Sequence, residues 1–369
     1  MSLTRRNLLQ AGLAAAGAAA LPASLRAAEG KHPAWLAEMQ REPAMLPPGT
    51  PQLASLLRDA SGQPITTREA WEKRRAEIRR DWLEFLGPPP AERRGTPQLE
   101  IVESDRIGSV IRERVRYEIE PGISSEGYLC RPEKTKGRVP GVAVFHSTIH
   151  NSIRQPAGYG TDQEKAFALH LAERGCVTFS PRNFLWPETE KLSAKPEAEA
   201  FLKRKPKSRG MAKMLYDAQV AVDILAARAD VDPARIGSVG HSLGAKEVLY
   251  LAAFDERVTA TVSSEGGIGM SFTNWNDLWY LGPVVKEAGF ARDHHELLAL
   301  AAPRPFLLIG GDSADGRKSW PYIARGLEVY RLYGAPAPLG LFVHPKGHAV
   351  PPEAEEKTYG WLGAYLSFS

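Results

Sequence analysis

The stretch that decides the fold covers residues 235–253 and reads RIGSVGHSLGAKEVLYLAA. Residues 236–239 are a short apolar run of the kind that forms a buried strand, and residues 245–253 have the composition and spacing of a helix. Between them, residues 240–244 form a G-x-S-x-G motif, whose glycines allow two backbones to approach closely. A strand, a sharp turn and a helix in this order lift a serine oxygen clear of the sheet. The sequence therefore predicts Ser242 as a nucleophile.

Strand-like and helix-like segments alternate on both sides of this motif. Residues 141–146 are a continuous apolar run, which is typical of a parallel strand buried on both faces. Helical patterns at 164–174 and 211–228 separate the following strand-like runs. We therefore expect an α/β fold with an eight-stranded, mostly parallel sheet that is covered by helices on both faces.

The region before the sheet has a different, polar and helical pattern. A helix is predicted to begin at Thr67 and to end before the GPPP sequence of residues 87–90. We assign residues 29–95 to an N-terminal helical extension and residues 96–369 to the catalytic domain.

The first 30 residues are typical of an export signal. The sequence TRRNLL at residues 4–9 precedes a weakly apolar run rich in Ala, Gly and Leu. Paired arginines before such a run resemble a bacterial twin-arginine signal, which predicts a signal peptide over residues 1–28 and a periplasmic or secreted protein. An N-terminal membrane anchor is the alternative. Because the run contains Gln10 and Pro22, we expect no stable membrane insertion after signal removal.

The composition is that of an ordinary globular protein, with 43% hydrophobic residues, 24% charged residues and a net charge of +4. No segment resembles a nucleic-acid-binding module. No Cys/His spacing is typical of a zinc site, and no phosphate-binding loop is present, so we expect neither a metal nor a cofactor. Cys130 and Cys176 lie in strand-like segments and are predicted to be buried core thiols, with a disulfide after export as the alternative.

A nucleophilic serine needs a histidine base, and the base needs an orienting carboxylate. His348 follows the last predicted strand in the loop PKGHAVP of residues 345–351, and we predict it as the base. For the acid, Asp315 is our first choice because it lies in the loop after the strand at 305–310. Glu265 is the alternative, at the end of the preceding strand, and Asp312 is the third candidate.

The oxyanion of a tetrahedral intermediate requires two N–H donors. We expect one from the amide of Leu243 and the other from the loop after residues 141–146, where Ser147 or Thr148 is best placed and Thr148 is our assignment. Aromatic residues in later loops are predicted either to stack on the substrate or to pack a lid onto the domain; they are Trp275, Trp279, Tyr280 and Trp320.

Most of the chain after about Thr67 resembles the dienelactone hydrolase and acetyl xylan esterase branch of the α/β-hydrolases. The segments that carry the resemblance are FHST, LAERGCVTFSPRN, DVDPARIGSVGHSLGA, AAFDERV, APRPFLLIGGDSAD and KGH. The resemblance implies the α/β-hydrolase fold and a serine hydrolase that acts on carboxylic esters.

The chain also resembles glucuronoyl esterases. Lys246 and Glu265 look like the substrate-binding lysine and the acid of that family. Leu243 stands where those enzymes carry an arginine that helps to hold the oxyanion.

These observations predict a serine esterase that forms an acyl-enzyme on a small-molecule or polysaccharide ester, such as an acetyl xylan or glucuronoyl ester. A peptidase of the prolyl-oligopeptidase type is less consistent with the sequence because no propeller-sized N-terminal region is present. A catalytically silent binding protein that keeps the fold is the remaining alternative.

Overall fold

The computed structural model describes residues 32–93, 95–187 and 194–368. The predicted signal peptide at residues 1–28 lies outside the described residues. Within the described ranges, nine strands form one sheet in the order β1-β2-β3-β5-β4-β6-β7-β8-β9. The sheet has one strand more than the eight expected, because an antiparallel edge strand extends it.

The first three strands are antiparallel and the others form a parallel sheet. β1 pairs with β2, β2 with β3, and β3 with β5, all antiparallel, whereas the pairs from β5 to β9 are parallel. The bounds of the strands are β1 (Glu100–Ile107), β2 (Val110–Glu120), β3 (Ile123–Pro132), β4 (Val139–Phe145), β5 (Val177–Pro181), β6 (Val231–His241), β7 (Val258–Ser264), β8 (Phe306–Gly310) and β9 (Leu339–Val343).

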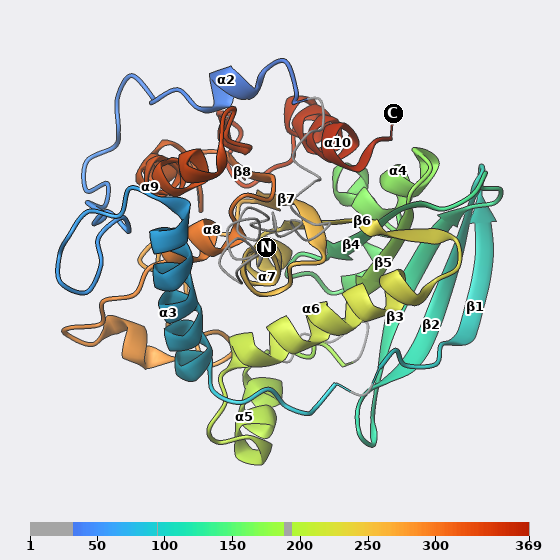
Figure 1. The fold of residues 1–369 in the computed structure, drawn as a ribbon. Coiled ribbons are helices and arrows are strands. Elements are labelled where there is room, and N and C mark those ends of the chain that lie inside the picture. Colours follow the sequence, from blue (N-terminus) through green and yellow to red (C-terminus); the bar gives the residue numbers. More distant parts are fainter. Residues whose placement is uncertain (1–31, 94, 188–193, 369) are drawn as a thin grey trace, which may run out of the picture.

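Helices cover both faces of the sheet, as predicted, and Figure 1 shows α4 and α10 on one side and α6 on the other. Within β4, Val142 and Val144 pack in the core with α4 and α10, whereas Ala143 and Phe145 pack with α6, because side chains alternate along a strand. The helix bounds are α2 (Leu36–Met39), α3 (Arg68–Leu86), α4 (Phe167–Glu173), α5 (Ala194–Arg204), α6 (Gly210–Ala227), α7 (Leu243–Phe254), α8 (His295–Ala301), α9 (Trp320–Tyr330) and α10 (Pro352–Leu366).

The region before the sheet contains α3, which begins and ends where the sequence predicts. The hydroxyl of Thr67 accepts a hydrogen bond from the amide of Ala70, and the helix ends at Gly87 with a φ of 78°. Trp82 of α3 is fully buried, and its Nε1 donates to Glu296 of α8 at 2.6 Å. The helix is therefore anchored to the main domain by both apolar packing and a hydrogen bond.

The carboxyl ends of the parallel strands lie along the same edge of the sheet, where α/β proteins build their sites. Ser242 follows β6, Glu265 follows β7, Asp315 lies after β8, and His348 lies in the loop after β9. Among the residues that the structure describes, no helix is both long enough and apolar enough to cross a membrane.

Candidate active site

Ser242 occupies a strained turn between β6 and α7. Its φ of 58° and ψ of −113° lie outside the regions that side-chain-bearing residues normally adopt, and its amide donates to the carbonyl of Ser264 at 2.8 Å. A Cβ at Gly240 would collide with the backbone of Gly244, and one at Gly244 with the backbone of Phe145. Both glycines are therefore required by the close approach of α7 to β6 and β4. Strain of this kind is typical of functional sites.

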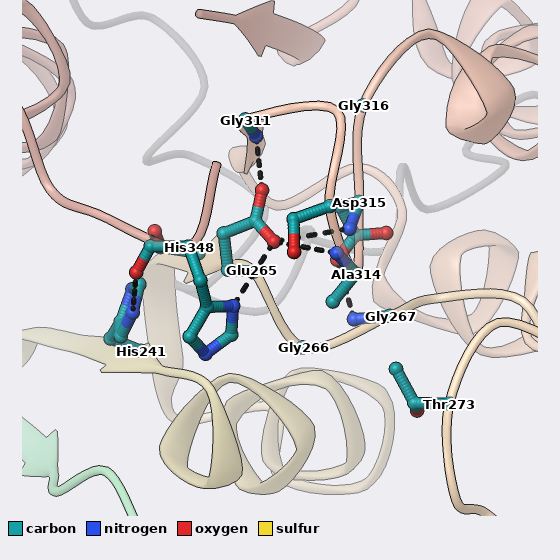
Figure 2. A network of polar contacts seen from close by, with 12 residues as sticks. His241, Glu265, Gly266, Gly267, Thr273, Gly311, Ala314, Asp315, Gly316 and His348 are labelled. Atoms are coloured by element: carbon teal, nitrogen blue, oxygen red, sulfur yellow. Dashed lines mark hydrogen bonds and ion pairs between the residues drawn. The ribbon is translucent and has the colours of Figure 1, made fainter. Parts of the chain in front are cut away.

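His348 lies in the loop after β9, and this loop is tied to the end of β8. The amide of His344 donates to Gly310 at 2.9 Å, and the amide of Gly347 donates to Gly311 at 3.1 Å. The His348 side chain is 46% exposed, and its Nδ1 lies 3.3 Å from Oε2 of Glu265 (Figure 2). The imidazole thus has one nitrogen on a carboxylate, and the other nitrogen remains for proton transfer.

The carboxylate that faces His348 belongs to Glu265. Its side chain is buried, and it accepts hydrogen bonds from the amides of Gly311, Ala314 at 2.8 Å and Asp315 at 3.3 Å. The φ of Glu265 is 57°, so the chain turns sharply at the end of β7. These amides fix the carboxylate with Oε2 directed at the imidazole, as Figure 2 shows.

In the structure His348 contacts Glu265, the alternative acid, whereas Asp315, the first choice, has other partners. The carboxylate of Asp315 accepts from the amides of Gly267 at 2.7 Å and Ile268 at 2.8 Å and from the hydroxyl of Ser319 at 2.8 Å. Burial raises the pKa of this carboxyl, and the hydrogen bonds oppose that effect. Each of the two carboxylates is therefore held by amides of the other's loop, but Glu265 is the one that reaches His348.

Asp312 has a local role. Its oxygens accept from the amide and from Nε of Arg317, both at 2.9 Å. This carboxylate therefore stabilises the turn after β8, and the structure gives it no contact with His348.

His241 lies between the nucleophile turn and the loop of His348, a placement that the sequence did not predict. It precedes Ser242 and is buried; its Nδ1 lies 3.0 Å from Oγ of Ser264, and its Nε2 lies 3.2 Å from the carbonyl of His348. The rings of His241 and His348 are 4.8 Å apart between centroids. Nothing in the motif indicates this contact, because the second residue of G-x-S-x-G is variable.

The loop after β4 is held by His146. The Nε2 of His146 accepts from the amide of Asn183 at 3.2 Å, so Nδ1 carries the proton and donates to the carbonyl of Ser147 at 2.7 Å. Burial lowers the pKa of His146 to about 4, which keeps this ring neutral. The amide of Ser147 is already bound by Gln155 at 3.2 Å. Because a trans peptide points its N–H away from its carbonyl, the Thr148 amide faces the opposite side and remains the candidate donor.

Lys246 lies inside the domain and has partners there. Its Nζ donates to the carbonyl of Gly266 at 2.7 Å and to the hydroxyl of Thr273 at 2.5 Å, and it lies 3.9 Å above the ring of Trp275. Burial lowers the pKa of Lys246 to about 7. In this conformation the lysine is buried, and its ammonium group binds the segment after Glu265.

Of the two alternatives for the aromatic residues of the later loops, burial favours packing over stacking on a substrate. Trp275 is fully buried, and its Nε1 donates to the carbonyl of Gly267 at 2.7 Å; Tyr280 and Trp320 are also buried. Of the four aromatic residues, Trp279 alone is partly exposed. The sequence could not show that the segment after β7 folds back over its own aromatic side chains.

The thiols of Cys130 and Cys176 are free and buried, and burial raises the pKa of each to about 12. Within the described ranges, no group of three or more His, Cys, Asp or Glu side chains is arranged to hold a metal ion.

Comparisons with known proteins bear on the fold and on the class of the protein. Residues 125–278 match the dienelactone hydrolase family. The chain is 25% identical over 249 residues to the putative hydrolase YtaP of Bacillus subtilis, covering 64% of this chain and 80% of that protein. It is 26% identical over 179 residues to the carbohydrate esterase MZ0003 of an unknown prokaryote, covering 40% and 41% of the two chains.

Solved structures share the fold. A glucuronoyl esterase from Solibacter usitatus superimposes with a TM-score of 0.69 at 21% identity, covering 88% of this chain and all of that one. A putative acetyl xylan esterase from Bacteroides fragilis has a TM-score of 0.61 at 15% identity, with 76% and 77% covered. These matches confirm the α/β-hydrolase fold and the resemblance inferred from the motifs, and with the family match they identify the chain as a hydrolase.

Proposed function

We propose that this hydrolase cleaves carboxylic esters of carbohydrates, with Ser242 as nucleophile, His348 as base and Glu265 as the acid that orients the base. The observation that carries the proposal is the contact of 3.3 Å between Nδ1 of His348 and Oε2 of Glu265, next to the strained turn of Ser242. A carboxylate in this position holds the imidazole in the tautomer that accepts the serine proton.

The reaction follows from these positions. His348 accepts the hydroxyl proton as Ser242 Oγ attacks the acyl carbon, and the amides of Leu243 and Thr148 stabilise the oxyanion. The alcohol leaves with the proton from His348, which gives an acyl-enzyme. Water then attacks the acyl carbon, its proton passes to His348, and the carboxylic acid is released as Ser242 recovers its proton.

Among carbohydrate esters, a glucuronoyl ester is our first candidate. The support is the acid at Glu265, after β7, which matches the resemblance to glucuronoyl esterases better than an acid at Asp315 would. An acetyl ester of xylan is the second candidate. Two features favour it. Nζ of Lys246 is already bound by Gly266 and Thr273, and the residue after the nucleophile is Leu243, which is uncharged and buried.

The proposal includes export to the periplasm or the medium. It rests on the paired arginines Arg5 and Arg6 before the apolar run. Residues 1–28 would then be removed, leaving the N-terminal extension (29–95) and the catalytic domain (96–369).

The experiment is a comparison of kcat/KM on methyl-glucuronoyl, acetyl-xylan and feruloyl esters, with the Ser242→Ala variant as the matched blank. We expect the glucuronoyl ester to be the best substrate and the variant to be inactive. A preference for the acetyl ester would move the assignment to the second candidate. Failure of the wild-type protein to hydrolyse any ester would refute the proposed function.

A further inference from the structure

We propose that His241 is a positioning residue, which holds the loop of His348 against the nucleophile turn through a hydrogen bond from its Nε2 to the His348 carbonyl. The inference rests on the proposed function, because it concerns how the base of that reaction is placed. It assigns a role to the residue that directly precedes the nucleophile. The motif itself does not explain why a histidine stands at this position.

The hydrogen-bond partners of His241 fix its tautomer. The carbonyl of His348, 3.2 Å from Nε2, can only accept, so Nε2 must carry the ring proton. Nδ1 then accepts from the hydroxyl of Ser264, at 3.0 Å. Burial holds the pKa of His241 well below its usual range, and the neighbouring His348 lowers it further. A neutral ring with one proton on Nε2 satisfies both contacts at once.

The loop that carries the base needs such a contact because it is exposed. Pro345, Lys346 and Ala349 are exposed, and so is His348 itself. The amides of His344 and Gly347 also anchor the loop, through their bonds to the end of β8. The bond from His241 acts on the backbone of His348, so it fixes the Cα from which the imidazole projects (Figure 2).

The location of His241 couples the base to the nucleophile. His241 is the last residue of β6 and is covalently joined to Ser242. One buried side chain therefore sets the position of the base relative to the turn that carries the serine. A displacement of about 1 Å between reacting groups can lower the rate about a hundredfold, so the loss of this bond should be visible in kcat.

Three substitutions separate the hydrogen bond from simple packing of the ring. In His241→Gln, the side-chain amide reaches about as far as Nε2 and can donate to the His348 carbonyl. In His241→Asn, the shorter amide reaches Ser264 but not His348. His241→Phe retains a ring of similar shape without either polar contact.

For the Asn and Phe variants we expect kcat to fall about 10- to 100-fold, with KM changed by less than about twofold. The Gln variant should retain kcat within about threefold of the wild type, because it restores the donor. Amide hydrogen exchange should accelerate in residues 344–350 of the Asn and Phe variants, without a comparable change in α7 or the sheet. A melting temperature measured for each variant controls for general loss of stability.

Two results would overturn the inference. One is a wild-type kcat in His241→Phe. The other is an equal loss of kcat in all three variants, if that loss follows the decrease in melting temperature. The exchange measurement requires no turnover. If the wild-type protein hydrolysed no ester, the proposed function would fail, while exchange at residues 344–350 would still show whether His241 holds this loop.

Discussion

Replacing Glu265 with Gln tests which carboxylate serves the base. Both oxygens of Glu265 accept from backbone amides, Oε1 from Gly311 and Oε2 from Ala314 and Asp315, and Oε2 also faces His348. A glutamine presents an NH₂ group in place of one oxygen. In either orientation, this group meets an N–H donor of the loop after β8, and the contact with the imidazole is weakened or reversed.

The expected loss in kcat is about a thousandfold to ten-thousandfold. Loss of the corresponding carboxylate costs about 10⁴ in the best-studied triad. We set the lower bound because the contact of 3.3 Å is long for a charge-assisted hydrogen bond. By the usual conversion, this range is about 4 to 5.5 kcal/mol of transition-state stabilisation. Unpaired amide donors should also lower the free energy of unfolding by about 1–3 kcal/mol.

The matched control is Asp315→Asn, which makes the same chemical change in the neighbouring carboxylate. This residue binds Gly267, Ile268 and Ser319, so its loss should destabilise the fold by about as much while lowering kcat by roughly tenfold or less. Initial rates on the best ester, together with urea unfolding of both variants, give the comparison. If Asp315→Asn were the crippling change and Glu265→Gln nearly silent, the assignment of the acid would be refuted.

Three further predictions concern other parts of the chain. His146→Leu should lower kcat about 10- to 100-fold with little change in KM, because the Thr148 amide loses its alignment; an unchanged kcat would exclude this donor. Burial raises the pKa of Glu296 to about 7, so between pH 4.5 and pH 7 the folded state keeps a proton that the unfolded state releases. Stability should therefore fall with rising pH across this window, by up to about 3 kcal/mol, and urea unfolding of Glu296→Gln should lack this part of the slope. Changing Arg5 and Arg6 to Lys should leave precursor in the cytoplasm, and unchanged periplasmic yield on a blot would contradict the twin-arginine assignment.

The sequence predicts the parts of the site that local backbone geometry imposes. The turn at Ser242 follows from its two glycines, because no Cβ fits where α7 passes β6 and β4. The edge of the sheet that carries the site follows from the alternation of strands and helices. His348 could be proposed because its loop follows the last parallel strand.

The choice between Glu265 and Asp315 could not be made from the sequence. Both follow parallel strands at the same edge, and the choice depends on the positive φ of Glu265 and on the amides that each loop directs at the other. Burial of Trp275 likewise depends on how the segment after β7 folds back. His241 and His146 contact backbone carbonyls, and such contacts leave no side-chain pattern in the sequence.

The most direct test of the central claim is the mass of the protein after reaction with a fluorophosphonate, followed by peptide mapping. An activated serine forms a covalent phosphonyl adduct, which an ordinary hydroxyl does not form. We predict one adduct per chain, located on Ser242 and absent from the folded Ser242→Ala variant. A folded wild-type protein that gains no adduct, or an adduct that persists at full yield in Ser242→Ala, would contradict the assignment of Ser242 as the nucleophile.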